Sequence, residues 1–312
     1  MSIFMKILLS FIQLFWVLVV APLLAGVIQK TKALLQGRIG PRLFQPYYDL
    51  AKFFRKSAVF SEHTSWLTRL TPYIVITTTI VASMFIPFLK DGFFFTGDII
   101  LFIYLLGMGR FFSALAALDT GSSFGGMGAS REMSLNTVIE PAFVLAIIAI
   151  IIQTGTTSFS QVLTILSSSE MYVSLPYILS LLAMFLVILG ETGRIPVDNV
   201  DTHLELTMIH EGMLLECSGR YYSLMSYHSM IKQFIFIGLF VVFYLPFFQV
   251  EITSVLSGLG AIVILTVKIL LVGIVVAFVE MTYAKMRLYQ IPRLFVTSMT
   301  LSVLALIVHF MF

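Results

Sequence analysis

The chain has 312 residues, of which 59% are hydrophobic and only 11% are charged. Soluble domains carry about 25% charged residues, so this composition excludes a soluble domain and predicts an integral membrane protein. The formal net charge of +3 requires no nucleic acid as a partner. A single cysteine, Cys217, excludes an internal disulfide bond. It also excludes an iron–sulfur cluster held by this chain alone, because a cluster normally needs several cysteine ligands.

Apolar stretches long enough to cross a membrane recur along the whole sequence, and a helix lets each stretch satisfy its own backbone hydrogen bonds. The sequence therefore predicts an all-α, polytopic integral membrane protein in which residues 1–312 form a single transmembrane domain. We expect about eight transmembrane helices, at residues 7–29, 72–89, 98–118, 136–153, 175–190, 231–248, 259–279 and 294–312.

Most of the 19 lysine and arginine residues fall in the loops that follow the first, third, fifth and seventh of these helices. Lys90 is the only basic residue in the intervening loops. Since cytoplasmic loops carry an excess of basic residues, this distribution predicts that both termini lie outside. Three segments then form the cytoplasmic face: residues 30–71, 119–135 and 191–230.

The first cytoplasmic segment contains a turn and an amphipathic helix. Residues 36–46 read Gln-Gly-Arg-Ile-Gly-Pro-Arg-Leu-Phe-Gln-Pro, in which the glycines and prolines favour a turn. In residues 47–56 the side chains of Tyr47, Leu50, Phe53 and Phe54 share one helical face. This helix, which follows the first transmembrane helix, either anchors the chain in lipid beside snorkelling lysines or walls the entrance of a cavity.

The second cytoplasmic segment is rich in glycine. Residues 118–132 read Leu-Asp-Thr-Gly-Ser-Ser-Phe-Gly-Gly-Met-Gly-Ala-Ser-Arg-Glu. A phosphate-binding loop is weakly supported, because no Lys-Ser/Thr pair follows the glycines and no strand precedes them. We expect instead a loop whose backbone packs closely against a neighbouring element.

The third cytoplasmic segment concentrates carboxylates. These side chains serve as proton carriers, form a charged docking surface, or simply lie in a solvated loop. The pair His210-Glu211 resembles the start of a zinc-protease motif, but residue 214 is leucine, and we expect no metal at His203, Glu205 and His210. Six of the 16 acidic residues lie in residues 190–219: Glu191, Asp198, Asp201, Glu205, Glu211 and Glu216.

Several ionisable side chains fall inside or at the ends of the expected spans. Such residues are costly in lipid, so they normally face a hydrated interior or pair with one another. Alternating acids and bases that lead inward from an acidic loop suggest a proton route, and structural ion pairs are the alternative. The residues concerned are Arg110, Glu140, Glu191, Lys268 and Glu280.

Two motifs carry a resemblance to a known family. Gln36-Gly-Arg-Ile-Gly-Pro41, with Asp49-Leu-Ala-Lys52 after it, is one, and Glu191-Thr-Gly-Arg194, followed by Glu216-Cys-Ser-Gly219, is the other. The chain resembles the membrane subunit 1 family of respiratory complex I and of membrane-bound nickel–iron hydrogenases. The glycine-rich segment is more similar to the formate hydrogenlyase and hydrogenase-4 branch. The acidic loop has fewer carboxylates at its centre than in quinone-reducing members, and Cys217 stands where they usually have tyrosine.

The resemblance implies a joint between a hydrophilic electron-transfer arm and the membrane arm. It implies that this joint or cavity is lined by Arg38, Asp49, Asp119, Arg131, Glu132 and Arg194. It also implies an ion-coupling path through Arg110, Glu140, Glu191, Asp198, Glu205, Glu211, Glu216, Lys268 and Glu280.

The function that the resemblance implies is that of a non-redox membrane subunit in an energy-converting nickel–iron hydrogenase of a prokaryotic plasma membrane. The chain would bind no cofactor and have no catalytic centre; the nickel–iron centre and the iron–sulfur clusters would belong to hydrogenase large and small subunits. Antiporter-like membrane subunits and the lipid bilayer would be further partners. The alternatives are a quinone-binding subunit 1 of a complex I-type enzyme, a less favoured role, and a stand-alone secondary transporter. The sequence leaves open the electron donor and the choice between proton and sodium.

Overall fold

The computed structural model describes residues 3–88, 98–168, 174–198, 208–247 and 255–311, and the regular elements in these ranges are helices. The prediction of an all-α polytopic membrane protein is confirmed. The α-helices are α1 (Ile3–Leu35), α2 (Gln45–Phe54), α3 (Trp66–Phe85), α4 (Ile99–Asp119), α5 (Ser123–Thr154), α6 (Phe159–Ser168), α7 (Leu175–Glu191), α8 (Gly219–Tyr244), α9 (Val255–Thr282) and α10 (Ile291–Met311), with short 3-10 helices η2 (Glu211–Leu214) and η3 (Leu288–Gln290).

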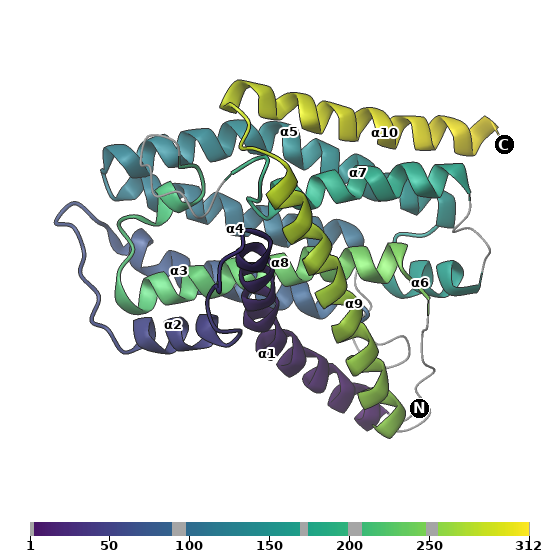
Figure 1. The fold of residues 1–312 in the computed structure, drawn as a ribbon, viewed down its shortest axis with the longest axis horizontal. Coiled ribbons are helices and arrows are strands. Elements are labelled where there is room, and N and C mark those ends of the chain that lie inside the picture. Colours follow the sequence, from purple (N-terminus) through teal and green to yellow (C-terminus); the bar gives the residue numbers. More distant parts are fainter. Residues whose placement is uncertain (1–2, 89–97, 169–173, 199–207, 248–254, 312) are drawn as a thin grey trace.

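Helix α8 occupies the centre of the bundle (Figure 1). Every residue from 231 to 244 is buried, including the polar pair Lys232 and Gln233. Around it, α10 packs along α7 and α5, α3 packs against α4, and α1 pairs with α9. A helix that is buried on every side is a span enclosed by other helices, so its two polar residues must find partners inside the protein.

Six of the described helical segments are long and apolar enough to cross a membrane: Ile7–Leu35, Ile99–Asp119, Ser123–Thr154, Gly219–Tyr244, Ser257–Thr282 and Leu288–Met311. The other two expected spans fall on α7, which is apolar but has only 17 residues, and on α3. Helix α3 is less apolar because it carries several threonines on buried positions, among them Thr71, Thr78 and Thr79. The hydroxyl of each of these threonines donates a hydrogen bond to a backbone carbonyl of its own helix.

All three expected loops are wrong in part, because helices extend into them; in the first, residues 30–71, α1 runs to Leu35 and α3 begins at Trp66. The segment 119–135 is not a loop beyond its first residues, since α5 begins at Ser123 and runs through all the remaining glycines. The expected close packing is present: a Cβ on Gly128 would lie 3.0 Å from the backbone carbon of Gly212 in η2. The segment 191–230 likewise becomes helical at Gly219, where α8 begins. Helix α6 lies outside every predicted span.

The amphipathic helix expected after the first span is confirmed as α2, which buries Pro46 and Leu50. Helix α2 lies along α8, and η2 packs against α5. Figure 1 shows α2 and the beginnings of α3 and α5 at the same end of the bundle. The three segments predicted to share one membrane face therefore gather at one end of the molecule.

Candidate functional site

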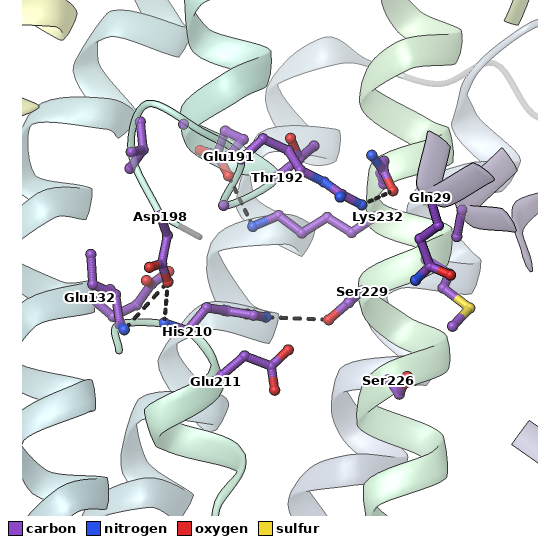
Figure 2. Close-up of a pocket in the computed structure, with 18 of the residues that line it drawn as sticks. Gln29, Glu132, Glu191, Thr192, Asp198, His210, Glu211, Ser226, Ser229 and Lys232 are labelled. Atoms are coloured by element: carbon purple, nitrogen blue, oxygen red, sulfur yellow. Dashed lines mark hydrogen bonds and ion pairs between the residues drawn. The ribbon is translucent and has the colours of Figure 1, made fainter. Parts of the chain in front are cut away.

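A cavity of about 250 Å³ opens at this end of the bundle. Its walls come from α1, α2, α5, the end of α7 with the loop after it, η2 and α8. Figure 2 shows Lys232 extending from α8 toward Glu191, with Asp198, His210 and Glu211 on the same side of the cavity and Gln29 on the other. Eight of the lining residues are acidic or basic: Asp49, Glu132, Glu191, Arg194, Asp198, His210, Glu211 and Lys232.

A first chain of ion pairs leads from Glu140 on α5 to this cavity. Arg110 of α4 contacts Glu140 of α5 at 3.2 Å and Glu191 of α7 at 2.6 Å. The second carboxylate oxygen of Glu191 lies 3.1 Å from the Lys232 ammonium group. Four side chains from four helices thus alternate in charge, and Glu191, whose side chain is 1% exposed, is held between two cations.

Because Glu191 is buried, its negative charge needs cations beside it. Moving one charge out of water costs several kcal/mol. Removing the partner of a buried charge destabilises a protein by about 3–5 kcal/mol. Glu191 is the last residue of α7, where the helix C-terminus disfavours a negative charge. The two cations, Arg110 and Lys232, offset both costs. The charge of Glu191 at the cavity wall therefore depends on Arg110 and Lys232 remaining charged.

A second chain of polar contacts reaches the cavity from the α1–α9 pair. Lys32 of α1 lies 2.8 Å from Glu280 of α9, and Arg194 lies 3.4 Å from the other oxygen of Glu280. That contact is ionic without the geometry of a hydrogen bond. The Arg194 guanidinium also donates to Gln233 Oε1 at 2.7 Å. The two chains meet on α8, since Lys232 and Gln233 are neighbours in sequence.

Gln233 of α8 binds Arg194 through its side-chain oxygen. Arginine can only donate, so the bond from Arg194 fixes the Gln233 oxygen toward the guanidinium and turns Nε2 away from it. Gln233 lines the cavity, and its Nε2 has no hydrogen-bond partner within the described ranges. Gln233 therefore uses its oxygen for the bond to Arg194 and keeps its amide nitrogen buried beside the cavity.

Asp198 fastens the acidic loop over the cavity. One of its oxygens accepts from the backbone N–H groups of Ile209 and His210, at 3.3 and 3.2 Å. The other lies 2.8 Å from Lys285, just beyond α9. The His210 ring contacts Ser229 of α8 through Nε2 at 3.2 Å. These bonds place η2, and with it Glu211, at the cavity wall.

The structure brings together most of the predicted site residues. Arg131 donates to the carbonyl of Met208 at 3.0 Å and so ties α5 to the acidic loop. Helix α2 walls the cavity with Pro46, Asp49 and Phe53, in agreement with one of its two interpretations. Glu191, Arg194, Asp198, Glu211, Asp49 and Glu132 line the cavity, while Arg110, Glu140 and Glu280 belong to the ion-pair chains that reach it.

Other predicted residues lie elsewhere. Arg38 and Glu216 are exposed and do not line the cavity. Asp119 accepts hydrogen bonds from the backbone of Ser65 and from Thr68, at 3.0 and 2.5 Å, and thereby caps the start of α3. Glu205 lies outside the described residues. The predicted site residues therefore fall into two groups, those that line the cavity and those that lie outside it.

Lys268 does not join the ion-pair chains. Its ammonium group donates to the carbonyls of Leu245, at 3.0 Å, and of Phe247, which follow the end of α8. Lys232 lies 13 positions before Leu245, and at 1.5 Å per residue this corresponds to about 20 Å along the helix. Lys268 satisfies carbonyl groups that the end of α8 leaves without helical partners.

Sequence reasoning misses four residues of the site. Lys232, Lys32 and Lys285 count there only toward the positive-inside rule, and Gln233 carries no signal of its own. The sequence places Lys232 at a loop edge because it predicts that α8 begins at residue 231, whereas the helix begins at Gly219. An earlier start would have placed a lysine near the middle of a long helix, which is itself a signal of function.

The residues around the cavity bear differently on a metal ion and on a quinone. In the ranges that the structure describes, no group of three or more His, Cys, Asp and Glu side chains is placed to hold a metal; His203 and Glu205 lie outside those ranges. A cofactor pocket is mostly apolar and usually has a volume of about 300–1,000 Å³. The cavity, at about 250 Å³, lies just below this range, and its lining combines eight acidic or basic side chains with apolar ones such as Leu135, Ile139 and Phe53.

Comparison with known proteins places the chain among membrane subunits. Residues 7–311 match the family described as NADH dehydrogenase. Formate hydrogenlyase subunit 4 of Escherichia coli (strain K12) is 32% identical over 93% of this chain and 94% of its own length. Hydrogenase-4 component C of the same organism is 32% identical over 92% and 91%. A chain from the membrane-bound sulfane sulfur reductase, an archaeal respiratory membrane complex, shares the fold, with a TM-score of 0.85 and 23% identity over 97% and 99% of the two chains.

Proposed function

Because the chain belongs to the NADH dehydrogenase family, we propose that it is the non-redox membrane subunit of an energy-converting nickel–iron hydrogenase. In this role it anchors the electron-transfer arm and couples its chemistry to the movement of protons or sodium ions. The two relatives that are 32% identical, one named for formate hydrogenlyase and one for hydrogenase-4, support the hydrogenase assignment. The redox centres of such an assembly belong to large and small subunits docked on the cavity end.

The observation that carries the coupling role is the meeting of two buried polar chains at one polar cavity. Glu191 is shared by Arg110 and Lys232, at 2.6 and 3.1 Å. A charge that appears or disappears in the cavity changes which protonation state of these groups is favoured, because opposite charges within about 4–6 Å favour the charged form. Redox turnover in a docked subunit would supply such a change through Glu211 and the loop that Asp198 fastens.

The chemical step assigned to this chain is proton movement alone. A proton that enters the cavity is taken up by a carboxylate such as Glu211, which weakens the field that keeps Lys232 charged. Lys232 and Glu191 can then exchange a proton across their 3.1 Å contact, and Arg110 passes the resulting change in field on to Glu140. Glu191 contacts both Arg110 and Lys232, so it keeps a charged partner on one side during this exchange, which limits the cost of burial.

The hydrogenase assignment is tested by purifying the chain, tagged at its C-terminus, from its native membranes. The expected result is an assembly that contains nickel and iron–sulfur subunits together with further membrane subunits, and that evolves hydrogen from a reduced low-potential donor. Isolation of the chain alone, with ion transport activity in liposomes, would instead identify the stand-alone transporter.

The quinone-reducing role is the second candidate, and one observation favours it. A component of the NADH-quinone oxidoreductase of Syntrophobacter fumaroxidans is 28% identical over 89% of this chain and 86% of its own length. The purified assembly separates the two roles, since a quinone-reducing enzyme would oxidise its donor only when a quinone is added. We expect donor oxidation and hydrogen evolution without added quinone.

A further inference from the structure

Four exposed cationic side chains outside the cavity share one feature, which is that each lies over an aromatic ring. They are Lys52 and Lys56 on α2, Arg69 near the start of α3 and Arg220 at the start of α8. The Lys52 and Lys56 ammonium groups are 5.8 and 5.5 Å from the centre of the Phe53 ring. The Arg69 guanidinium is 4.9 Å from the Phe60 ring, and that of Arg220 is 5.1 Å from the Tyr221 ring.

Direct contacts join these pairs into one surface, here called the basic–aromatic collar (Lys52, Phe53, Lys56, Phe60, Arg69, Arg220, Tyr221). The Phe53 ring packs on Tyr222 at 4.8 Å, and the Phe60 ring packs on Tyr221 at 4.9 Å. Ser218 exchanges two hydrogen bonds with the backbone of Val59, at 2.7 and 2.8 Å. The collar therefore runs without a break from α2 across the start of α8 to the start of α3.

The four cations of the collar form no ion pair with any carboxylate in the part of the chain that the structure describes. Two acidic residues, Glu62 and Glu216, are exposed in neighbouring segments, and neither is paired with them. The positive charge of the collar is therefore available to an external anion.

Large apolar side chains stand exposed among these cations. Trp66 is 71% exposed, Val59 is 72% exposed and Tyr48 is 62% exposed. The border of a bilayer places cations beside Trp, Tyr and aliphatic side chains in the same way. Lysine and arginine there reach the phosphates while their neighbours enter the acyl region.

We propose that the basic–aromatic collar binds the phosphate groups of anionic phospholipids. The arginines supply forked donors for phosphate oxygens, and the lysines supply compact positive charges. The exposed Trp66 and Tyr48 side chains lie against the acyl chains of the same lipids. The collar sits on α2, which also walls the cavity, so bound lipid holds that wall in place.

The test uses the intact purified assembly in neutral detergent, titrated with phosphatidylglycerol or with phosphatidylcholine. Native mass spectrometry counts the bound lipids. We expect tighter binding of phosphatidylglycerol, and about thirtyfold weaker binding in the double variant Arg69→Gln/Arg220→Gln, because each basic residue near an anionic surface contributes about fivefold. The matched control is Arg287→Gln/Arg293→Gln, two exposed arginines near the start of α10 that lie outside the collar.

Three outcomes overturn the proposal. The first is equal binding of the two lipids by the unmodified assembly. The second is the same phosphatidylglycerol affinity in collar and control variants. The third is loss of a protein subunit from the collar variant with unchanged lipid affinity, which would identify an acidic protein as the occupant. If Arg69→Gln/Arg220→Gln does not assemble, Lys52→Gln/Lys56→Gln on the exposed face of α2 answers the same question.

Discussion

At the scale of single residues, the site depends on a few charges whose partners are fixed. Glu191 is buried between Arg110 and Lys232, whereas Glu140, at the other end of the same chain of ion pairs, has a side chain that is 45% exposed. The two glutamates share one cation but differ in burial. Their removal should therefore have different energetic consequences.

We expect Glu191→Gln to lower the free energy of unfolding by about 3–5 kcal/mol, because it leaves a buried cation without its carboxylate. Glu140→Gln should lower it by less, because Arg110 keeps Glu191 as its second carboxylate. Unfolding of the purified chain by SDS in mixed micelles measures both values. Equal losses in the two variants would contradict the burial argument.

Cys217 gives a prediction about pH. Burial raises the pKa of its thiol to about 11, and the neighbouring Glu216 carboxylate adds to the rise. The thiolate is the reactive form, so alkylation by iodoacetamide should be slow near neutral pH and should accelerate as the pH rises toward about 11. An exposed thiol, introduced by Ser57→Cys in a Cys217→Ser background, serves as the control. Similar rates for the two thiols near pH 8 would refute the assignment.

At the scale of elements, the glycine-rich start of α5 holds η2 in place. A Cβ on Gly128 would lie 3.0 Å from the backbone of both Gly212 and Met213, whereas a Cβ on Gly126, on another face of α5, would meet nothing within 4 Å. The approach of two backbones at glycine thus positions the short helix that carries Glu211.

We expect Gly128→Ala to destabilise the protein by about 1–3 kcal/mol through overpacking. Gly126→Ala should be neutral or stabilising by up to about 1 kcal/mol, because alanine favours the helix. The midpoint of thermal unfolding of the purified assembly distinguishes the two variants. An unchanged midpoint for Gly128→Ala would show that η2 does not rest on α5 as described.

Most of the helices can be predicted from apolar length, and α2 from its amphipathic pattern. Helix starts at the cavity end cannot. The stretches 123–135 and 219–230 are polar or rich in glycine, so they resemble loops, yet tertiary packing around Gly128 and Gly219 makes them helical. The sequence anticipates the pairing of Arg110 with Glu191 only as a general tendency of buried charges to pair. The sequence does not predict Lys232 as a site residue, because it places the start of α8 at residue 231 instead of Gly219.

At the scale of the whole molecule, one end of the bundle holds the cavity, the acidic loop and the basic–aromatic collar. The positive-inside rule predicts that this end faces the cytoplasm. Single cysteines in a Cys217→Ser background test the orientation: Ser57→Cys lies at the cavity end, and Phe310→Cys lies at the end of α10. In intact cells, a membrane-impermeant maleimide should label the Phe310→Cys variant alone. Labelling of the Ser57→Cys variant alone would reverse the orientation.

The proposed coupling of redox turnover to ion movement rests on the charges that line the cavity. It is measured as the ion uptake per electron pair of the assembly in liposomes, compared between Glu211→Gln and Glu216→Gln. Glu211 lines the cavity, whereas Glu216, five residues later, is exposed and does not. We predict that Glu211→Gln lowers the ratio severalfold while the assembly stays intact, and that Glu216→Gln keeps it. A normal ratio in the Glu211→Gln variant, with normal turnover, would contradict the coupling role.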